Sequence, residues 1–508
     1  MSARVLMVQG TSSSAGKSLL VAGLCRMFRR DGYRVAPFKA QNMALNSAAT
    51  PDGLEISRAQ AVQAEAAGIE PSVDMNPILL KPEGDSRCQV VVLGKPCETL
   101  SAQHYYQKKT ELWGIVSSSL ERLRDLYDLV LIEGAGSPAE VNLRESDLVN
   151  MRVALSVQAP VLLVGDIDRG GVFASLVGTM ELLQPEERAL VKGLVINKFR
   201  GDVTLLKSGL GFLEQRAGVP VLGIVPYLHN LLISEEDSVA LDAVRPGAGL
   251  LDIAVVRLPR IANFDDFDLL AAEQGVGLRY VTEPLRLGRP DLIIIPGSKS
   301  TVNDLAFLRE SGLARAIVAQ ARSGTPVLGI CGGYQMLGET ILDPERVESN
   351  QVETPGLGLL PATTTFSASK RTVRVKARVV AKSGPFASSY GNEIAAYEIH
   401  IGTTEHRAEP MFQIMDDGGS YGRDVSTLDA DGCALPDGLV MGSYLHGLFE
   451  NACLRRSLIE WLATRRGIPV PRDGQKSIER DAEYDRLANC LRDNLDLEAL
   501  YRITGLRR

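Results

Sequence analysis

Near its N-terminus the chain reads Arg4-Val-Leu-Met-Val-Gln-Gly-Thr-Ser-Ser-Ser-Ala-Gly-Lys-Ser18, and this stretch decides the fold. The apolar run predicts a strand, the Gly/Ser-rich run a loop, and the residues from Lys17 onward a helix. Backbone N–H groups in such a loop cradle phosphate oxygens, and the helix dipole adds attraction. Lys17 supplies positive charge to the phosphates, and the Ser18 hydroxyl can bind Mg²⁺.

This loop departs from the common G-x-x-x-x-G-K-[S/T] pattern. One extra residue separates Gly10 from Gly16, and Thr11 stands where a glycine is expected. A Gly/Ser-rich turn without a ligand is the alternative. The position of the loop directly after the first strand favours a nucleotide site. The predicted ATP-binding loop residues are Gly10, Thr11, Ser14, Gly16, Lys17 and Ser18.

Short apolar runs alternate with amphipathic segments along the first half of the chain. This alternation predicts a mostly parallel sheet covered on both faces. The expected strands are 4–9, 33–37, 128–133, 160–165, 192–197 and 220–225, and the expected helices are 17–31, 56–67, 104–126, 171–183 and 203–217.

The polar, Gly/Pro-bearing segment 242–250 predicts a linker. A second α/β pattern follows it, with strands expected at 251–256, 291–295, 325–330 and 438–444. We therefore expect two doubly wound α/β domains of mostly parallel sheet and a helical C-terminal tail. The domain limits are an ATP-binding domain at 1–241, the linker, a second domain at 251–451 and a helical extension at 452–508.

Polar side chains follow several strands of the first domain. Glu133, Asp166 and Asn197 each come at the end of an apolar run. Ligands of open α/β sheets bind at the carboxyl ends of strands. We expect Glu133 to share Mg²⁺ with Ser18, and Asn197 to contact adenine. Each acid alone could instead cap a helix or lie in a solvated loop.

A second substrate would need its own polar contacts. The segment Lys39-Ala-Gln-Asn-Met-Ala-Leu-Asn46 follows the second strand and could contact an acceptor. The candidate residues for that role are Gln41, Asn42, Asp147 and Asp166.

The second domain carries Thr325-Pro-Val-Leu-Gly-Ile-Cys-Gly-Gly-Tyr-Gln-Met-Leu337. Cys331 would lie on a strand-to-helix elbow, where a helix N-terminus favours the thiolate. Glycines beside it permit a sharp turn and close approach of a carbonyl group. The alternative is a buried core cysteine. We predict a nucleophile.

A cysteine nucleophile needs a base, and the chain has five histidines. His446 lies in Gly442-Ser-Tyr-Leu-His-Gly-Leu-Phe449, where an apolar run ends at a loop. This position suits a general base, although a structural histidine is the alternative.

Composition excludes several classes of function. The net charge is −7 and no long basic stretch is present, which argues against a nucleic-acid partner. Seven cysteines without a Cys-x-x-Cys pair indicate a reducing setting without disulfides or a zinc site. The N-terminus reads as a strand rather than a signal peptide, and no apolar run reaches membrane-spanning length. We expect a cytoplasmic protein without a membrane partner.

The motifs together resemble known enzymes. The N-terminal half resembles the dethiobiotin-synthetase-like ATP-binding enzymes through Gly10–Ser18, Glu133-Gly-Ala-Gly136 and Asn197. The C-terminal half resembles a flavodoxin-like class I glutamine amidotransferase domain of the cobyrinic acid amidase family. Motifs in order along the whole chain carry this resemblance: Lys39–Ser47, Gly165–Ala174, Ile196–Asp202, Pro296–Thr301, Gly329–Gln335, Tyr397–Gly402 and Tyr444–Gly447.

The resemblance implies an ATP- and glutamine-dependent amidation in cobalamin biosynthesis. Its corrinoid substrate would be adenosylcobyrinic acid a,c-diamide, whose b, d, e and g carboxylates become amides to give adenosylcobyric acid. ATP and Mg²⁺ would activate each carboxylate as an acyl phosphate. Glutamine would be the nitrogen donor, with Gly297, Gly332 and Gln335 forming the oxyanion and glutamine site beside Cys331.

The chain departs from the general amidotransferase pattern at one position. Many class I domains carry a glutamate two residues after the catalytic histidine, and here that residue is Leu448. The resemblance therefore implies a Cys331–His446 dyad without a carboxylate. It leaves the role of His400 open.

Two other readings remain. Another amidotransferase of the same plan, such as cobyrinic acid a,c-diamide synthase or a cell-wall lipid amidating complex, would act on a different carboxylate. A ParA/MinD-like regulatory ATPase would share the loop and sheet but would need neither Cys331 nor His446. A glutaminase assay separates these two classes.

Overall fold

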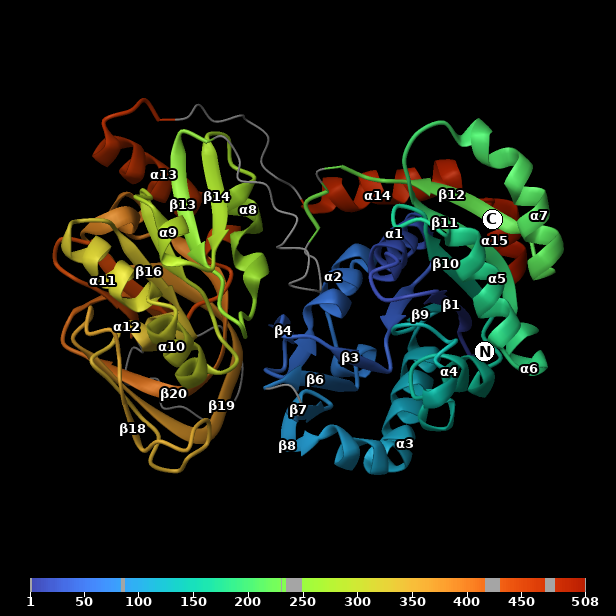
Figure 1. Cartoon of the computed structure of the whole chain (residues 1–508), viewed down its shortest axis with the longest axis horizontal. Helices are drawn as coiled ribbons and strands as arrows, with labels where there is room; N and C mark the ends of the chain where they lie inside the picture. The colour runs from blue at the N-terminus through green and yellow to red at the C-terminus, as the bar shows by residue number, and fades with distance from the viewer. Residues whose placement is uncertain are drawn as a thin grey trace. The chain divides into compact units, whose positions relative to one another are not determined.

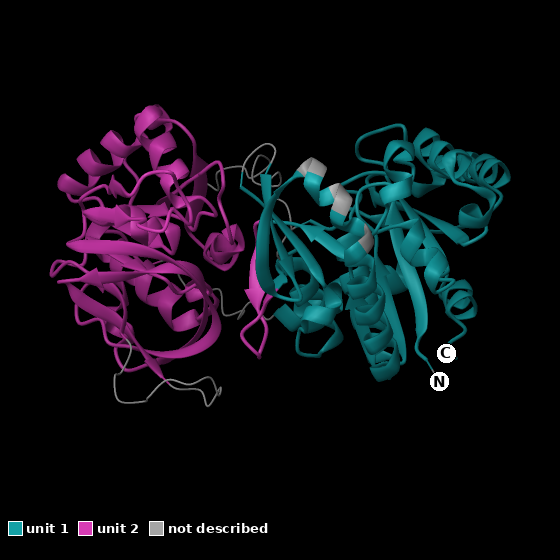
Figure 2. Ribbon diagram, turned by 90° about the horizontal axis from the view of Figure 1, so that it is seen from below, with its two compact units in different colours: residues 1–44, 56–236, 479–508 teal, residues 45–55, 237–478 magenta. Residues whose placement is uncertain are grey.

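The computed structural model describes residues 2–83, 87–229, 231–233, 249–415, 430–470 and 480–507. The chain forms two compact units, coloured separately in Figure 2. Unit 1 comprises residues 1–44, 56–236 and 479–508, and unit 2 comprises 45–55 and 237–478. The chain therefore passes between the units more than once.

Unit 1 is built on a parallel sheet in the order β12-β11-β10-β1-β9-β2 (Figure 1). Its central strands are buried along most of their length, as expected for a parallel sheet covered on both faces. The predicted strands are confirmed within a few residues. Their bounds are β1 Arg4–Gly10, β2 Val35–Phe38, β9 Leu129–Glu133, β10 Val161–Asp166, β11 Val191–Phe199 and β12 Val221–Pro226.

Helices cover this sheet, and each of the predicted segments contains a helix. Their bounds are α1 Lys17–Arg30, α2 Arg58–Ala67, α3 Ala102–Leu126, α4 Met151–Ser156, α5 Val172–Leu182, α6 Pro185–Arg188 and α7 Lys207–Ala217, with short 3₁₀ turns η1 Val73–Met75, η2 Val141–Ser146 and η3 Val203–Leu206. A small second sheet, which was not predicted, has the order β3-β6-β7-β8. Its strands are β3 Gln41–Met43, β6 Ile78–Pro82, β7 Arg87–Val92 and β8 Lys95–Ser101.

The C-terminal helices α14 (Arg480–Asn494) and α15 (Leu497–Thr504) belong to unit 1, beside strand β12 and helix α1 (Figure 1). Gly23 of α1 leaves room for this packing, because a Cβ there would lie 2.6 Å from Leu491 Cδ1. Arg26 Nε donates to Asp485 Oδ1 at 2.7 Å across the same contact. The two ends of the chain thus share one core.

Unit 2 contains a mixed sheet in the order β14-β13-β15-β16-β23-β22-β21-β19-β17-β18, with β20 paired to β19. The strands from β14 to β23 run parallel. They are β13 Leu251–Val256, β14 Val276–Val281, β15 Leu292–Ile295, β16 Val327–Ile330 and β23 Val440–Ser443, and they include the four predicted strands.

An antiparallel extension completes the sheet of unit 2, and it was not predicted. Its long strands β19 and β20 alternate weakly between buried and exposed residues, so the apolar pattern that marks a strand is faint. The bounds are β17 Thr340–Leu342, β18 Glu353–Pro355, β19 Ala362–Val379, β20 Glu393–His406, β21 Glu409–Met415 and β22 Ala430–Ala434.

Short helices and two further strands complete unit 2. The helices are η5 Phe264–Phe267, α8 Asp268–Ala271, α9 Pro284–Leu287, α10 Thr301–Glu310, α11 Leu313–Arg322, α12 Gly332–Leu337, η6 Gly384–Ser389, η7 Leu448–Glu450 and α13 Ala452–Arg466. The inserted residues 45–55 carry β4 (Ser47–Ala49) and begin β5 (Glu55–Ser57). The predicted extension 452–508 thus gives α13 to unit 2 and α14 and α15 to unit 1, whereas most of the predicted linker 242–250 lies outside the described residues.

Candidate active sites

The first site is the loop between β1 and α1. Gly16 has φ 91° and caps α1, and a Cβ there would lie 2.2 Å from Asn197 Nδ2. Asn197 Nδ2 donates to the Ala15 carbonyl at 2.9 Å and so fastens the loop to the end of β11. A contact between Asn197 and adenine stays a prediction.

Lys17 reaches across the loop. Its Nζ donates to the Ser12 carbonyl at 2.9 Å and to the Gly136 carbonyl at 3.1 Å. Gly10 lies beneath it, since a Cβ at that residue would meet Lys17 Nζ at 3.0 Å, and the Thr11 N–H donates to the Val164 carbonyl at 2.9 Å. The lysine cation therefore sits among loop carbonyls where an anionic phosphate would be neutralised.

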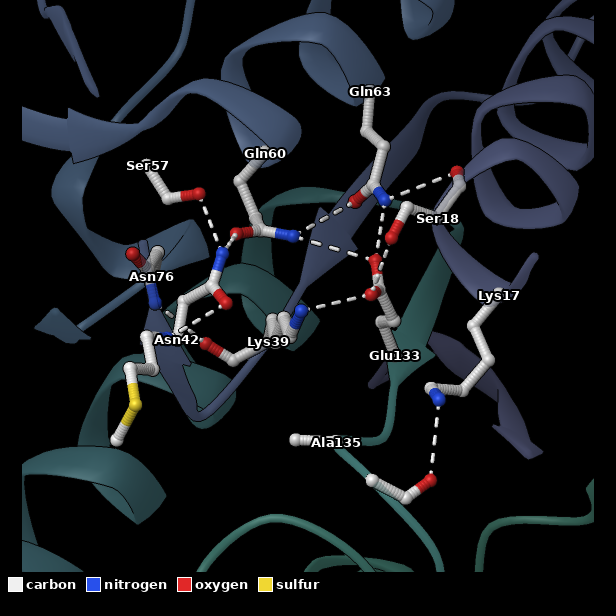
Figure 3. Close-up of polar contacts among 12 residues, drawn as sticks. Lys17, Ser18, Lys39, Asn42, Ser57, Gln60, Gln63, Asn76, Glu133 and Ala135 are labelled. Atoms are coloured by element: carbon white, nitrogen blue, oxygen red, sulfur yellow. Dashed lines mark hydrogen bonds and ion pairs between the residues drawn. The ribbon is translucent and has the colours of Figure 1, made fainter. Parts of the chain in front are cut away.

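Glu133, at the end of β9, is the centre of a hydrogen-bond network (Figure 3). Its carboxylate is buried, with Oε1 accepting from Ser18 Oγ at 2.8 Å and from Lys39 Nζ at 2.9 Å. Oε2 accepts from Gln63 Nε2 at 2.5 Å. Burial by itself raises the pKa of Glu133, but the Lys39 cation and these hydrogen bonds bring it below its usual range.

This donor set suits Mg²⁺, which binds proteins through one or two carboxylates and completes its shell with phosphate and water oxygens. The Ser18 hydroxyl and the ionised Glu133 are hard oxygen donors at the edge of the phosphate loop. Within the described ranges no three His, Cys, Asp or Glu side chains form a metal cluster, so a metal here would depend on nucleotide oxygens as well.

The second site lies in unit 2 at Cys331. The residue directly follows β16, caps α12 and has φ 51° and ψ −111°, so it lies on a sharp elbow. Gly333 is required behind it, because a Cβ there would lie 1.9 Å from the Ile295 carbonyl oxygen. The thiol is largely buried, with Sγ 3.6 Å from the Ile399 carbonyl oxygen. The predicted strand–turn–helix arrangement is present.

His446 follows β23 and contacts a carboxylate that the sequence did not reveal. Its Nδ1 lies 2.7 Å from Asp266 Oδ2, and the Gly447 N–H donates to Asp266 Oδ1 at 2.8 Å. The predicted dyad without a carboxylate is therefore wrong. Leu448, which replaces the usual glutamate, is a buried core residue, and the acid comes instead from η5, 180 residues earlier.

The charge on His446 follows from these neighbours. Burial of the ring lowers its pKa, but the Asp266 carboxylate and the Cys331 thiol together raise it to about 10. The imidazole is therefore a cation over the neutral range. An imidazolium beside a cysteine favours the thiolate, which is the nucleophilic form.

Gly297 and Gly332 lie next to this pair. A Cβ at Gly297 would be 3.1 Å from His446 Cε1 and 3.8 Å from Cys331 Cβ, whereas one at Gly332 would be 2.9 Å from the Ser298 nitrogen. Backbone therefore approaches the nucleophile closely, as an oxyanion site needs.

Gln335 lies one turn further along α12, and its amide is held by protein groups. Its Oε1 accepts from Thr301 Oγ1 at 3.0 Å, and its Nε2 donates to the Ile401 carbonyl at 3.0 Å. A direct contact from Gln335 to glutamine stays a prediction.

Both units match known families. A family described as CobQ/CobB/MinD/ParA nucleotide binding domain matches residues 6–239, and one described as CobB/CobQ-like glutamine amidotransferase domain matches residues 252–453. Over 504 residues the chain is 52% identical to a cobyric acid synthase of Dehalococcoides mccartyi (strain CBDB1), covering 99% of each protein. The chain belongs to the cobyric acid synthase family.

A cobyric acid synthase of Sorangium cellulosum (strain So ce56) is 54% identical over 524 residues, covering 100% of each chain. Membership of the cobyric acid synthase family confirms the predicted enzyme class, a glutamine-dependent amidation in cobalamin biosynthesis. The ParA/MinD-like reading leaves the amidotransferase match unexplained. In the described part of the chain no helix is both long and apolar enough to span a bilayer.

The residues proposed for an acceptor substrate all have partners within unit 1. Asn42 Nδ2 donates to Ser57 Oγ at 2.5 Å and to Gln60 Oε1 at 3.0 Å, and Gln60 continues to Glu133 (Figure 3). The Gln41 amide oxygen accepts from the Tyr105 hydroxyl. Asn42 is thus connected through Gln60 to the Glu133 network, and its contact with a substrate stays a prediction.

The carboxylates of Asp147 and Asp166 bind groups that hold the local backbone and the phosphate loop in place. The Asp147 carboxylate accepts three backbone N–H groups, two in the turn before α4 and one in its first turn. Asp166 pairs with Lys198, whose Nζ lies 3.0 Å from Asp166 Oδ2 and 2.7 Å from the Ser14 carbonyl. Lys198 has φ 60° and Ser14 has φ 55°, so both residues hold a left-handed conformation beside the loop.

Three residues that contact the two candidate sites were not predicted in these positions. Lys39 and Asp266 contact Glu133 and His446 directly, and Lys198 supports the loop. A signal existed for Lys39 and Lys198, because each lies at the end of a strand in the sheet that carries the site. Asp266 carried no such signal.

The histidine whose role was open, His400, belongs to a neighbouring network. Its Nε2 lies 3.2 Å from Glu398 Oε2, and its ring stacks on Tyr444 with centroids 3.8 Å apart. These contacts stabilise strand β20, which lies beside Cys331.

Proposed function

We propose that this chain amidates the b, d, e and g carboxylates of adenosylcobyrinic acid a,c-diamide with ATP and glutamine, giving adenosylcobyric acid. The observation that carries the proposal is the match to cobyric acid synthases along 99% of the chain. The residues that the two half-reactions need accompany it: Cys331, His446 and Asp266 in unit 2, and Lys17, Ser18 and Glu133 in unit 1.

The glutaminase half-reaction begins with attack of the Cys331 thiolate on the side-chain amide carbon of glutamine. Backbone N–H groups around Gly332 and Gly297 stabilise the oxyanion. The His446 imidazolium, held by Asp266, gives its proton to the departing nitrogen, which leaves as ammonia. His446, now neutral, takes a proton from water, and the resulting hydroxide attacks the thioester carbonyl. Glutamate forms, and the Cys331 thiolate and the His446 imidazolium are restored.

The amidation half-reaction uses the loop of unit 1. A substrate carboxylate oxygen attacks the γ-phosphorus of ATP, ADP leaves, and an acyl phosphate forms. Lys17 neutralises charge on the transferred phosphoryl group. Mg²⁺, bound by Ser18 and Glu133, would supply further positive charge to the phosphates. Ammonia then attacks the acyl carbon, and inorganic phosphate leaves.

Lys39 has a defined task in this scheme. Its ammonium group is buried and lies 2.9 Å from Glu133 Oε1, so it keeps that carboxylate ionised and ready to bind a cation. The reaction would take place in the cytoplasm, where a reducing environment keeps Cys331 as a thiol.

The nearest alternative, cobyrinic acid a,c-diamide synthase, differs only in the carboxylates it accepts. The test compares ATP hydrolysis with glutamine in the presence of adenosylcobyrinic acid a,c-diamide and of cobyrinic acid. We expect the a,c-diamide to stimulate hydrolysis of about one ATP per amide formed. Stimulation by cobyrinic acid alone, with a and c amides as products, would favour the alternative.

A further inference from the structure

Residues 45–55 reach the glutaminase unit although their sequence neighbours on both sides belong to unit 1. The Ser47 N–H donates to Asn263 Oδ1 at 3.0 Å, and Arg374 Nε donates to the Ala49 carbonyl at 2.7 Å. The Glu55 side chain is fully buried, where it pairs with Lys370 and accepts from Ser47 Oγ at 2.7 Å. These contacts fasten the segment to unit 2.

Asn263 is the residue that receives this segment. It is 3% exposed and has φ 51° and ψ 44°, a left-handed conformation that costs energy for a residue other than glycine. It caps η5, and its carbonyl accepts the Asp266 N–H at 3.1 Å. Its backbone therefore forms the start of the turn that presents Asp266 to His446.

The Asn263 side chain contacts the tyrosine that stacks on the histidine ring. Asn263 Nδ2 donates to Tyr397 Oη at 3.4 Å. The Tyr397 ring stacks on His446 with centroids 5.3 Å apart and planes 20° apart, and the two residues exchange backbone hydrogen bonds of 2.9 and 3.2 Å. Ala49 of the inserted segment packs in an apolar cluster with Tyr397 and Ile399.

We propose that residues 45–55 complete the glutaminase site, and that Asn263 is the positioning residue through which they do so. The proposal rests on the glutaminase role of Cys331 and His446. Asn263 contacts both supports of the His446 ring, the carboxylate turn and the tyrosine. Its backbone carbonyl makes the contact to the turn and its amide makes the contact to Tyr397. Ser47 binds that amide and so fixes Asn263 between the two supports, and the ring is aligned for proton transfer only when the segment is docked.

The test uses Asn263→Gly in the full-length protein, because glycine keeps the left-handed backbone but removes both side-chain hydrogen bonds. The control is Arg346→Gly, an exposed residue of unit 2 with φ 55°. We expect Asn263→Gly to lower kcat for glutamine hydrolysis about 10- to 100-fold with little change in KM. In this variant the alkaline limb of the pH profile for glutamine hydrolysis should move to lower pH. Amidation with ammonium salts should stay within about twofold of the rates of the parent and of the control.

The role of the inserted segment is tested separately by Ser47→Pro, which removes the N–H that Asn263 accepts. We expect the same loss of glutaminase kcat and the same pH shift, with ammonia-dependent amidation as the check of folding. If Ser47→Pro loses ammonia-dependent amidation, the segment is tested with Glu55→Gln instead, because this substitution leaves the backbone unchanged. Wild-type glutaminase kcat and pH profile in Asn263→Gly, or in the folded segment variant, would overturn the proposal. Absence of glutaminase activity from the parent protein would instead overturn the proposed function.

Discussion

Asp266 Oδ2 lies 2.7 Å from His446 Nδ1, in a site where both side chains are at most 4% exposed. This contact commits Nδ1 to the carboxylate and leaves Nε2 for the thiol and the departing nitrogen. The site therefore has the Cys–His–acid arrangement of a hydrolytic triad. The acid comes from a different segment of the chain from the one in the class I pattern, where it follows the histidine by two residues.

Replacing the acid tests that logic. Asp266→Asn removes the charge that raises the pKa of His446, so the imidazolium is lost at lower pH and the alkaline limb of glutaminase kcat/KM moves down from near pH 10. We expect kcat to fall roughly 10²- to 10⁴-fold. Asp437→Asn, a carboxylate in the turn before β23, is the matched control and should keep the parent profile. An unshifted limb in Asp266→Asn would exclude the carboxylate from this role.

Cys331→Ala separates the two half-reactions. Without the thiol, glutamine-supported amidation should fall to the background of the assay, whereas amidation with added ammonium salts at raised pH should continue. The measurement is the rate of amide formation with each nitrogen source. Loss of both activities from a folded variant would contradict the two-site scheme.

Lys17→Ala gives the complementary result. Its Nζ lies among the carbonyls of the phosphate loop, so its removal should lower ATP-dependent amidation with either nitrogen source. We expect a loss of about 10²-fold or more in kcat/KM for ATP, by analogy with other single charge-stabilising groups. Full ATP-dependent turnover in this variant would remove Lys17 from the reaction.

Gly16 and Gly32 form a matched pair of left-handed glycines, with φ 91° and 93°. A methyl group at Gly16 would lie 2.2 Å from Asn197 Nδ2, whereas one at Gly32 would meet nothing within 4 Å. Both alanine variants pay the backbone strain, but only Gly16→Ala should also weaken ATP binding, about 10-fold or more, as measured by calorimetry. Equal ATP affinities in the two variants would show that the close approach of Asn197 to the loop does not matter.

Lys39→Met tests the charge on Glu133. Burial raises the pKa of Glu133, and the Lys39 cation brings it down, so the variant should leave this carboxyl protonated at higher pH. The acid limb of ammonia-dependent amidation should therefore move to higher pH, since the ionised form is the one present above the pKa. Measuring this activity with ammonia keeps the glutaminase out of the profile, and an unchanged acid limb would contradict the assignment.

Local patterns were enough to predict the phosphate loop, the elbow at Cys331 and the parallel strands except β14. In each case the signal lies in a few consecutive residues: buried apolar runs, a Gly/Ser loop before a helix, or glycines around a cysteine. Asp266 and Ser47 were out of reach because their roles come from contacts with residues far along the chain. Asp266 sits in Asn263-Phe-Asp-Asp-Phe267, where three acidic or amide residues share a short turn and nothing local distinguishes the one that meets His446.

The antiparallel part of unit 2 was missed for a different reason. Strand β19 contains the run Lys370-Arg-Thr-Val-Arg-Val-Lys376, whose charged residues reduce the apolar alternation that marks a half-buried strand. Yet Lys370 and Arg374 from this run hold residues 45–55. Two of the charged residues that weaken the strand pattern are thus the ones that bind the inserted segment.

The reaction itself is tested most directly by mass. The protein would be incubated with adenosylcobyrinic acid a,c-diamide, ATP, Mg²⁺ and glutamine carrying ¹⁵N in its side-chain amide, in parallel with unlabelled glutamine. We expect the unlabelled product to be about four mass units lighter than the substrate, and the labelled product to be about four units heavier than the unlabelled one, because each carboxylate gains one glutamine nitrogen. An unchanged a,c-diamide in the presence of active glutaminase, or a product whose new amides carry no ¹⁵N, would contradict the proposed reaction.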